Sequence, residues 1–344
     1  MARLPPSMQT GELCEESRQM DPVLAVKNLK VGFRSDFGNS VVTDSISFSV
    51  QPGETLCIVG ESGCGKSVTS LAIMGLLASN GFIDDGEVLF EGTDLVKLSQ
   101  KELDAIRGKD LAMIYQDALA SLNPVFTIGT QMTEPLRIHL GMKRKDAYAR
   151  SVELLKLSGL SDADAVMKKY PHELSGGQRQ RAMIAMALAC SPKLLIADEP
   201  TTALDVTIQA QIMQRIRKIR GEMDMAMILI THDIGLVAQM ADRVLVMYAG
   251  QIIEEAEVGE LFAHPKHPYT RALLACAPDI YDSEERVLAS IRGTVPEAYW
   301  QIEGCRFAGR CDYACEACHA AQQMRTADDG AEGTSPHYVR CARV

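Results

Sequence analysis

Residues 60–67 read GESGCGKS and follow a short apolar run at residues 56–59. This octet fits the pattern G-x-x-x-x-G-K-[ST], a glycine-rich loop whose backbone N–H groups wrap nucleotide phosphates. Residues 68–77 are typical of a helix. The sequence therefore predicts the strand, glycine turn and helix that a phosphate-binding loop requires.

The positions of this loop offer different chemistry. Its glycines let the backbone turn N–H groups toward the β-phosphate, Lys66 adds positive charge at the β- and γ-phosphates, and Ser67 can hold Mg²⁺. We interpret Cys64 as filling a permissive position and not as a redox switch. We expect the loop and the residue after it to contact the nucleotide: Gly60, Glu61, Ser62, Gly63, Cys64, Gly65, Lys66, Ser67 and Val68.

Five further segments carry polar residues at informative places. Residues 174–178 read LSGGQ ahead of a helical pattern, and Gln116 follows the apolar run 111–115. Asp198 and Glu199 end another apolar run, residues 203–205 read ALD, and His232 follows residues 228–231. In this order, and together with the phosphate loop, these segments resemble the motifs of ABC-type ATPases, so ATP is the expected nucleotide.

The resemblance implies a role for each residue in hydrolysis of the γ-phosphate. Lys66 and Mg²⁺ neutralise charge, and Asp198 reaches the metal ion together with Ser67 and Gln116. Glu199 polarises the attacking water, and His232 bridges the glutamate region to the γ-phosphate. The predicted catalytic set is Lys66, Gln116, Glu199 and His232, with Phe33 where the family stacks an aromatic ring on adenine.

In that family two such domains meet head to tail. Gly176 and Gly177, at a helix N-terminus, then offer N–H groups to the γ-phosphate that the other subunit holds. We therefore expect Ser175, Gly176, Gly177, Gln178 and Asp205 to contact nucleotide in a dimer with a second, identical or homologous ATPase subunit.

Three longer segments narrow the resemblance to the oligopeptide/dipeptide importer subfamily. They are YQDALASLNPVFTIGTQM at 115–132, HPYTRALL at 267–274 and GCRFAGRC at 304–311, with Ala118 and Gly309 where the subfamily usually has proline. The resemblance implies a peripheral subunit at the cytoplasmic face of the inner membrane that hydrolyses ATP to power peptide import. Its partners would be the second ATPase subunit, two membrane permeases and an extracytoplasmic solute-binding protein. Import of nickel complexes, glutathione or opines is the alternative within the subfamily.

Five of the ten cysteines lie in the last 40 residues, and such crowding in a cytosolic protein suggests a metal site. Family tails carry C-x5-C-x6-C and a later cysteine, so Cys305, Cys311, Cys318 and Cys341 look like the ligands of an iron–sulfur cluster, [4Fe–4S]. Four thiolates also suit Zn²⁺, and the pair Cys315 and Cys318 beside His319 keeps zinc as the alternative. Free thiols are the third possibility.

The elements that must position these residues follow from the apolar patterns. Strand-like segments at 194–198, 226–231 and 244–248 alternate with helical ones, which predicts a mostly parallel sheet. Residues 23–33 and 46–50 indicate antiparallel strands, and 128–139 and 145–158 indicate helices. We predict an α/β fold with a RecA-like core, an antiparallel β subdomain and a helical subdomain. The expected ranges are an N-terminal extension at 1–21, the nucleotide-binding domain at 22–255 with its helical subdomain at about 117–180, and a cysteine-rich C-terminal extension at 256–344.

Composition excludes several other classes. The 344 residues are 47% hydrophobic, with no apolar run long enough to span a membrane and no secretory signal in the first twenty. A net charge of −10 argues against a nucleic-acid partner. The rival class, a soluble ABC-type ATPase acting on DNA or ribosomes, carries long coiled-coil insertions or tandem domains, whereas 57 residues separate Gln116 from Leu174. An inactive structural relative is disfavoured because every catalytic position is filled.

Overall fold

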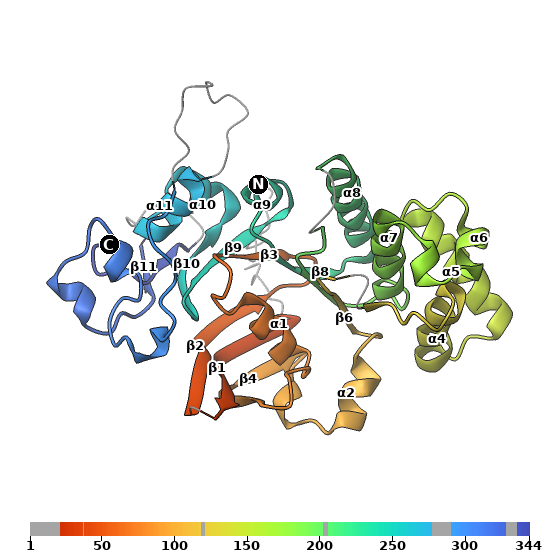
Figure 1. Ribbon diagram of the computed structural model, residues 1–344, viewed down its shortest axis with the longest axis horizontal. Coiled ribbons are helices and arrows are strands. Elements are labelled where there is room, and N and C mark those ends of the chain that lie inside the picture. Colours follow the sequence, from red (N-terminus) through yellow and green to blue (C-terminus); the bar gives the residue numbers. More distant parts are fainter. Residues whose placement is uncertain (1–20, 37, 118–120, 202–205, 277–289, 328–335) are drawn as a thin grey trace, which may run out of the picture.

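The computed structural model describes residues 21–36, 38–117, 121–201, 206–276, 290–327 and 336–344 (Figure 1). Nearly all of the predicted N-terminal extension, 1–21, lies outside these residues. The same holds for Ala118 and for the segment Ala203, Leu204 and Asp205. The predicted nucleotide contact of Asp205 is therefore not placed.

A four-stranded antiparallel sheet of order β2-β1-β4-β5 forms one layer. Its β2 alternates as predicted, because Ile46, Phe48 and Val50 are buried while Ser47 is exposed. The strands are β1 (Leu24–Ser35), β2 (Gly38–Val50), β4 (Gly81–Phe90) and β5 (Thr93–Asp94).

A larger sheet has the order β11-β12-β10-β9-β3-β8-β7-β6, and its strands lead into the segments of the predicted catalytic residues. From β9 to β6 neighbouring strands are parallel, and β3, β7 and β8 are buried along their whole length, as expected of strands covered on both faces. The strands are β3 (Thr55–Val59), β6 (Leu111–Ile114), β7 (Leu194–Asp198), β8 (Ala226–Ile230), β9 (Arg243–Tyr248), β10 (Gln251–Glu257), β11 (Arg325–Thr326) and β12 (Tyr338–Val339). The predicted α/β class is confirmed.

Helices cover this sheet and also form a group of their own, α4 to α7, at the right of Figure 1 with a separate hydrophobic core. The helix after the phosphate loop, α1, ends at Ile73 and not at Leu77 as predicted, because Gly75 turns the chain with φ +62°. The helices are α1 (Lys66–Ile73), α2 (Gln100–Ile106), α4 (Ile128–Leu140), α5 (Arg144–Leu157), α6 (Ala163–Lys168), α7 (Gly176–Ala187), α8 (Val206–Met223), α9 (Ile234–Met240), α10 (Val258–Ala263) and α11 (Pro268–Ala275).

The C-terminal segment, by which we mean the described residues after β10, lies along β10 and packs into the main core, at the left of Figure 1. Tyr299 and Phe307 are buried in the same hydrophobic cluster as residues of β3 and β9. Glu254 of β10 is fully buried and accepts hydrogen bonds from the His267 N–H and from His337 Nε2. The segment is thus held by the core and by buried polar contacts, in addition to any metal it binds.

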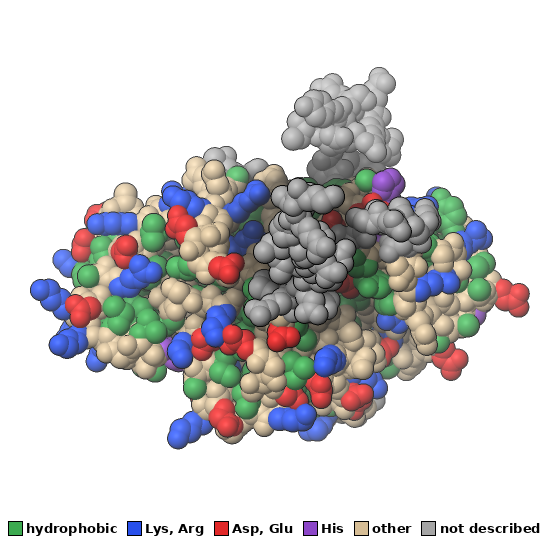
Figure 2. All heavy atoms as spheres, turned by 180° about the vertical axis from the view of Figure 1, so that it is seen from behind, with side chains coloured by type: hydrophobic (Ala, Val, Ile, Leu, Met, Phe, Trp, Pro, Cys, Tyr) green, Lys and Arg blue, Asp and Glu red, His purple; other side chains and the backbone are tan. Residues whose placement is uncertain are grey.

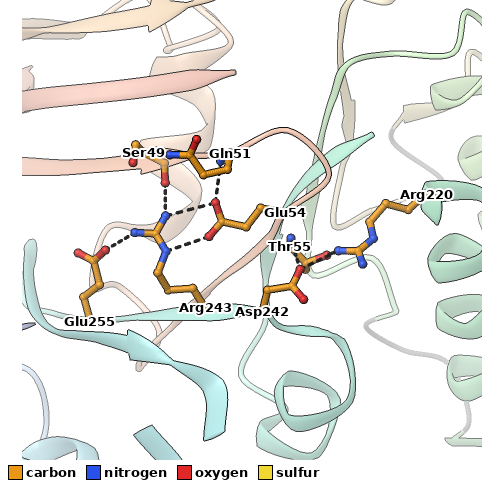
Figure 3. Close-up of polar contacts among 8 residues, drawn as sticks. All are labelled: Ser49, Gln51, Glu54, Thr55, Arg220, Asp242, Arg243 and Glu255. Carbon is orange, nitrogen blue, oxygen red and sulfur yellow. Dashed lines mark hydrogen bonds and ion pairs between the residues drawn. The ribbon is translucent and has the colours of Figure 1, made fainter. Parts of the chain in front are cut away.

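A network of ion pairs joins the two sheets where β3 begins (Figure 3). The Arg243 Nε donates to Glu54 Oε1 at 2.8 Å, and the same guanidinium contacts Glu255 and the Ser49 carbonyl. Burial would lower the pKa of Arg243, but Glu54 and Glu255 outweigh it and the net shift is upward. The network anchors the start of β3, and therefore the loop that follows β3.

Two surface properties bear on the predicted class. Among the described residues, no helix combines the length and the apolar character needed to cross a membrane. On the face shown in Figure 2, the visible acidic and basic side chains are interspersed and do not form a basic stripe.

Candidate functional site

The phosphate loop connects β3 to α1 in the conformation that its glycines allow. Gly60 has φ +155°, and a Cβ there would lie 2.2 Å from the Met247 carbonyl oxygen of β9. Only glycine fits this close approach. The Lys66 ammonium donates to the carbonyls of Gly60, at 2.7 Å, and Glu61, at 3.0 Å. The lysine is thus held over the start of its own loop.

A cavity of about 280 Å³ lies over this loop. Phe33, at the end of β1, is half-buried beside Gly81 and is not among the lining residues. Of the predicted contacts, Gly60, Glu61 and Cys64 do not line it either. The cavity is lined by Val42, Ser62, Gly63, Gly65, Lys66, Ser67, Val68, Gln116 and Glu199.

Cys64 is fully buried beneath the loop. Burial raises the pKa of its thiol, and the nearby Lys66 ammonium acts in the opposite direction without cancelling the effect. A protonated, buried thiol is a poor nucleophile, which argues against a redox switch at Cys64.

Ser67 and Asp198 bring two oxygen donors together at one end of the cavity. The Ser67 hydroxyl donates to Asp198 Oδ1 at 3.1 Å, and Asp198 ends the buried strand β7. Burial raises the pKa of Asp198, while its hydrogen bond with Ser67 works against the shift. A hydroxyl, a carboxylate and the oxygens of bound phosphates are ligands that Mg²⁺ prefers, so these residues fit the predicted metal ion.

Glu199 is the centre of a hydrogen-bonded group beside the cavity. Gln116 Nε2 donates to Glu199 Oε2 at 2.8 Å, and His232 Nδ1 lies 3.2 Å from Glu199 Oε1. The structure therefore brings three of the predicted catalytic residues together, although Gln116 contacts the glutamate and not Asp198. Glu199 also has φ +44°, a conformation that costs energy in a non-glycine residue and is common at functional sites.

Residues 174–178, which read LSGGQ, do not lie at this cavity. Ser175 caps the N-terminus of α7, accepting from the Gln178 N–H at 3.4 Å, and Gln178 Oε1 accepts from the Ser175 N–H. Ser175 and Gly176 are exposed, and a Cβ at Gly176 would meet nothing within 4 Å. None of these residues lines the cavity, and α7 is well separated from α1 in Figure 1. Gly176 is therefore exposed at the start of α7, where an anion could approach.

The four tail cysteines of the predicted ligand set lie near one another. Burial raises the pKa of Cys305, and the thiols of Cys318, Cys341 and Cys311 add to the shift. The nine cysteines in the described ranges are free of disulfides. However, among the residues that the structure describes, no three His, Cys, Asp or Glu side chains are arranged to hold a metal ion. The side-chain arrangement thus does not support the predicted metal site.

Contacts between the C-terminal segment and the phosphate loop were missed by the sequence analysis. The Glu61 N–H donates to the Tyr269 hydroxyl at 2.9 Å, and Arg310 Nη1 lies 3.0 and 3.1 Å from the two Glu61 carboxylate oxygens. Tyr269 and Arg310 lie in two segments, 267–274 and 304–311, that were singled out by resemblance alone. The resemblance identified these two segments, but it did not predict that Tyr269 and Arg310 contact Glu61.

Comparison with known proteins agrees with this geometry. The family described as "ABC transporter" matches residues 43–202, and the family described as "Oligopeptide/dipeptide transporter, C-terminal region" matches residues 253–318. A putative peptide import ATP-binding protein of Brucella melitensis is 50% identical over 89% of this chain and 93% of its own length. The oligopeptide transport ATP-binding protein AppD of Bacillus subtilis is 49% identical over 88% of this chain and 92% of its own.

Solved structures resemble the ATPase part. The dimeric bacterial ABC transporter cassette MJ0796 covers 68% of this chain and 98% of its own at TM-score 0.63 and 28% identity. A second structure of that cassette, in a post-hydrolysis state, contains ADP and phosphate. CbiO1 of Clostridium perfringens, part of the ABC transporter complex cbiONQ, covers 71% of this chain and 92% of its own at TM-score 0.60 and 27% identity.

Proposed function

Because this chain belongs to the family of ABC transporter ATP-binding proteins, we propose that it hydrolyses ATP to power import of di- or oligopeptides across the cytoplasmic membrane. The observation that carries this proposal is the Gln116–Glu199–His232 group beside the cavity of the phosphate loop. The names of the relatives support peptides as the substrate class over nickel complexes, glutathione or opines.

The proposed hydrolysis uses the residues in their observed places. The loop N–H groups and Lys66 hold the β- and γ-phosphates, and Ser67 and Asp198 would hold Mg²⁺, which would supply positive charge at the phosphates. Glu199 accepts a proton from a water molecule. The oxygen of that water attacks the γ-phosphorus, and the bond between the γ-phosphorus and the bridging oxygen of ADP breaks. Gln116 and His232 hold the Glu199 carboxylate in position. The products are ADP and phosphate.

We propose that the site is completed by a second, homologous ATPase subunit. Ser175, Gly176, Gly177 and Gln178 do not line the cavity of their own chain, and Gly176 is exposed at the start of α7. A helix N-terminus favours a bound anion such as the γ-phosphate. The dimeric cassette among the similar structures supports this head-to-tail arrangement.

We propose that the permeases dock on an apolar groove between the sheet core and helices α4 and α7. This cavity, of about 320 Å³, includes Met74, Met113, Tyr115 and Met183. A cytoplasmic helix of a permease is the proposed occupant, because Tyr115 adjoins Gln116 and so links the groove to the catalytic group. Docking there would hold the chain peripherally at the cytoplasmic face of the inner membrane, with a solute-binding protein on the other side.

Reconstituted transport tests the proposal. Proteoliposomes that contain the two permeases, this chain and its partner ATPase should take up a labelled oligopeptide from its binding protein only when ATP is inside. A nickel complex or glutathione should not compete. ATP-dependent uptake of a labelled nickel complex or of labelled glutathione, with no peptide uptake, would move the assignment to the alternative substrates.

The cysteine tail is proposed to hold a [4Fe–4S] cluster, with Zn²⁺ as the alternative. Support comes from the resemblance and from the spacing of the four cysteines, whose thiolates, if close together, would repel one another unless protonated or neutralised by a cation. Protein purified without oxygen is expected to be brown, with stoichiometric iron and sulfide. One zinc per colourless chain would favour the alternative, and metal-free anaerobic protein would refute both.

A further inference from the structure

We infer that Arg310 is a positioning residue for nucleotide binding, which holds the phosphate loop in place from the C-terminal segment. This inference rests on the proposed nucleotide site at that loop. Its basis is the two-oxygen contact between the Arg310 guanidinium and the Glu61 carboxylate, at 3.0 and 3.1 Å. Glu61 is the second residue of the loop and is separated from Arg310 by 249 positions in the chain.

Arg310 is itself rigidly held. Its side chain is 8% exposed, its Nε donates to the Arg292 carbonyl at 2.7 Å, and its Nη2 donates to the Gly293 carbonyl at 3.2 Å. The guanidinium also lies over the rings of Tyr248 and Phe307. An arginine whose donors are satisfied in a fixed plane positions its carboxylate partner more strictly than a solvated lysine could.

The contact reaches the residue that binds phosphate. Lys66 Nζ donates to the Glu61 carbonyl at 3.0 Å, and the Glu61 N–H is bonded to the Tyr269 hydroxyl. The side chain and the N–H of Glu61 are therefore hydrogen-bonded to the C-terminal segment, and its carbonyl is hydrogen-bonded to Lys66. Freeing the carboxylate would loosen the backbone on which Lys66 rests before nucleotide arrives.

A second contact from the same segment reaches a residue that lines the cavity. The Tyr299 hydroxyl donates to the carbonyl of Val42, a lining residue, at 3.0 Å. Arg306 donates to the Ala249 carbonyl and to Asp44 Oδ2, both at 2.6 Å. The C-terminal segment thus contacts both the phosphate loop and Val42 of the cavity lining.

The test is MgATP affinity of the full-length chain, measured by titration calorimetry. Losing a charge-assisted pair is expected to raise the Kd of the Arg310→Gln chain about tenfold. Turnover at saturating ATP in the assembled complex should stay near that of the wild type, because Arg310 does not touch the reacting atoms. Arg310→Lys, which keeps the charge, should recover part of the affinity.

Matched variants separate positioning from general destabilisation. Arg340 lies in the same segment, but it bonds to the Ile252 and Gln322 carbonyls, so Arg340→Gln should leave the Kd for MgATP unchanged. Glu61→Gln alone should weaken binding as Arg310→Gln does, and the double variant should be no weaker than either. The Glu61 variant also serves if the Arg310 variant does not fold.

Two outcomes would overturn the inference: wild-type affinity in a folded Arg310→Gln or Glu61→Gln chain, or an equal loss in Arg340→Gln. Lys66→Ala in the same titration tests the proposed nucleotide site separately from the role of Arg310. If that variant still bound MgATP normally, the proposed nucleotide site itself would be wrong.

Discussion

Replacing Glu199 with glutamine is expected to lower ATP turnover about 10²–10⁴-fold while ATP binding persists. The amide keeps the shape of the side chain and can still bond to Gln116 and His232, but it cannot accept the proton of the attacking water. The phosphate loop and Lys66 are unchanged, so the nucleotide remains bound. The variant should therefore accumulate the closed, ATP-bound dimer.

The measurement is turnover together with nucleotide retention in the assembled transporter. Glu222→Gln is a matched control, because this carboxylate on α8 is exposed and its nearest ion-pair partner, Lys218, is 3.9 Å away. It should hydrolyse ATP like the wild type. Wild-type turnover in the Glu199 variant would remove Glu199 from the mechanism.

Two variants are expected to distinguish ATP binding by a single chain from closure of the dimer. Lys66→Ala should abolish ATP binding by the isolated subunit, because Lys66 supplies the charge at the phosphates. Gly177→Asp should leave that binding intact, since Gly177 does not line the cavity. It should instead block dimer closure, because a carboxylate would face the γ-phosphate of the other subunit.

Equilibrium ATP binding by the lone chain and ATP-induced dimer formation by size-exclusion chromatography read out the two effects. Gly221→Asp is the matched comparison, because it adds the same charge at an exposed position of α8 with open space around it. Loss of ATP binding in the isolated Gly177→Asp chain would contradict the head-to-tail arrangement.

The parts that sequence predicted well are those whose geometry is local. The phosphate loop needs particular backbone angles within eight residues, so GESGCGKS determines strand, turn and helix together. Asp198 and Glu199 lie at the end of β7 and His232 just after β8, and the carboxyl ends of neighbouring parallel strands meet at one edge. Their convergence follows from the strand pattern.

The other features of the site depend on packing between segments that are far apart in the sequence. The hydrophobic periodicity of each segment does not indicate which other segment it contacts. Tyr269 and Arg310 reach Glu61 across 208 and 249 positions, and nothing in the composition near them indicates a partner. Phe33 lies beside Gly81 and is not among the residues that line the cavity, so its contact with adenine stays a prediction. The four cysteines illustrate the same limit, because their spacing predicts proximity but not the direction of each thiol.

The pairing of β12 with β10 has a consequence for solubility. Strand β10 contains the buried residues Ile252 and Ile253, and a seven-residue strand with an open edge would offer its unpaired backbone groups to any other extended chain. Two-residue strands, β12 and then β11, cover that edge instead, with Glu254 opposite Val339 and Glu255 opposite Tyr338. The sheet therefore ends in two-residue strands, which offer fewer unpaired backbone groups for growth edge to edge than β10 alone would.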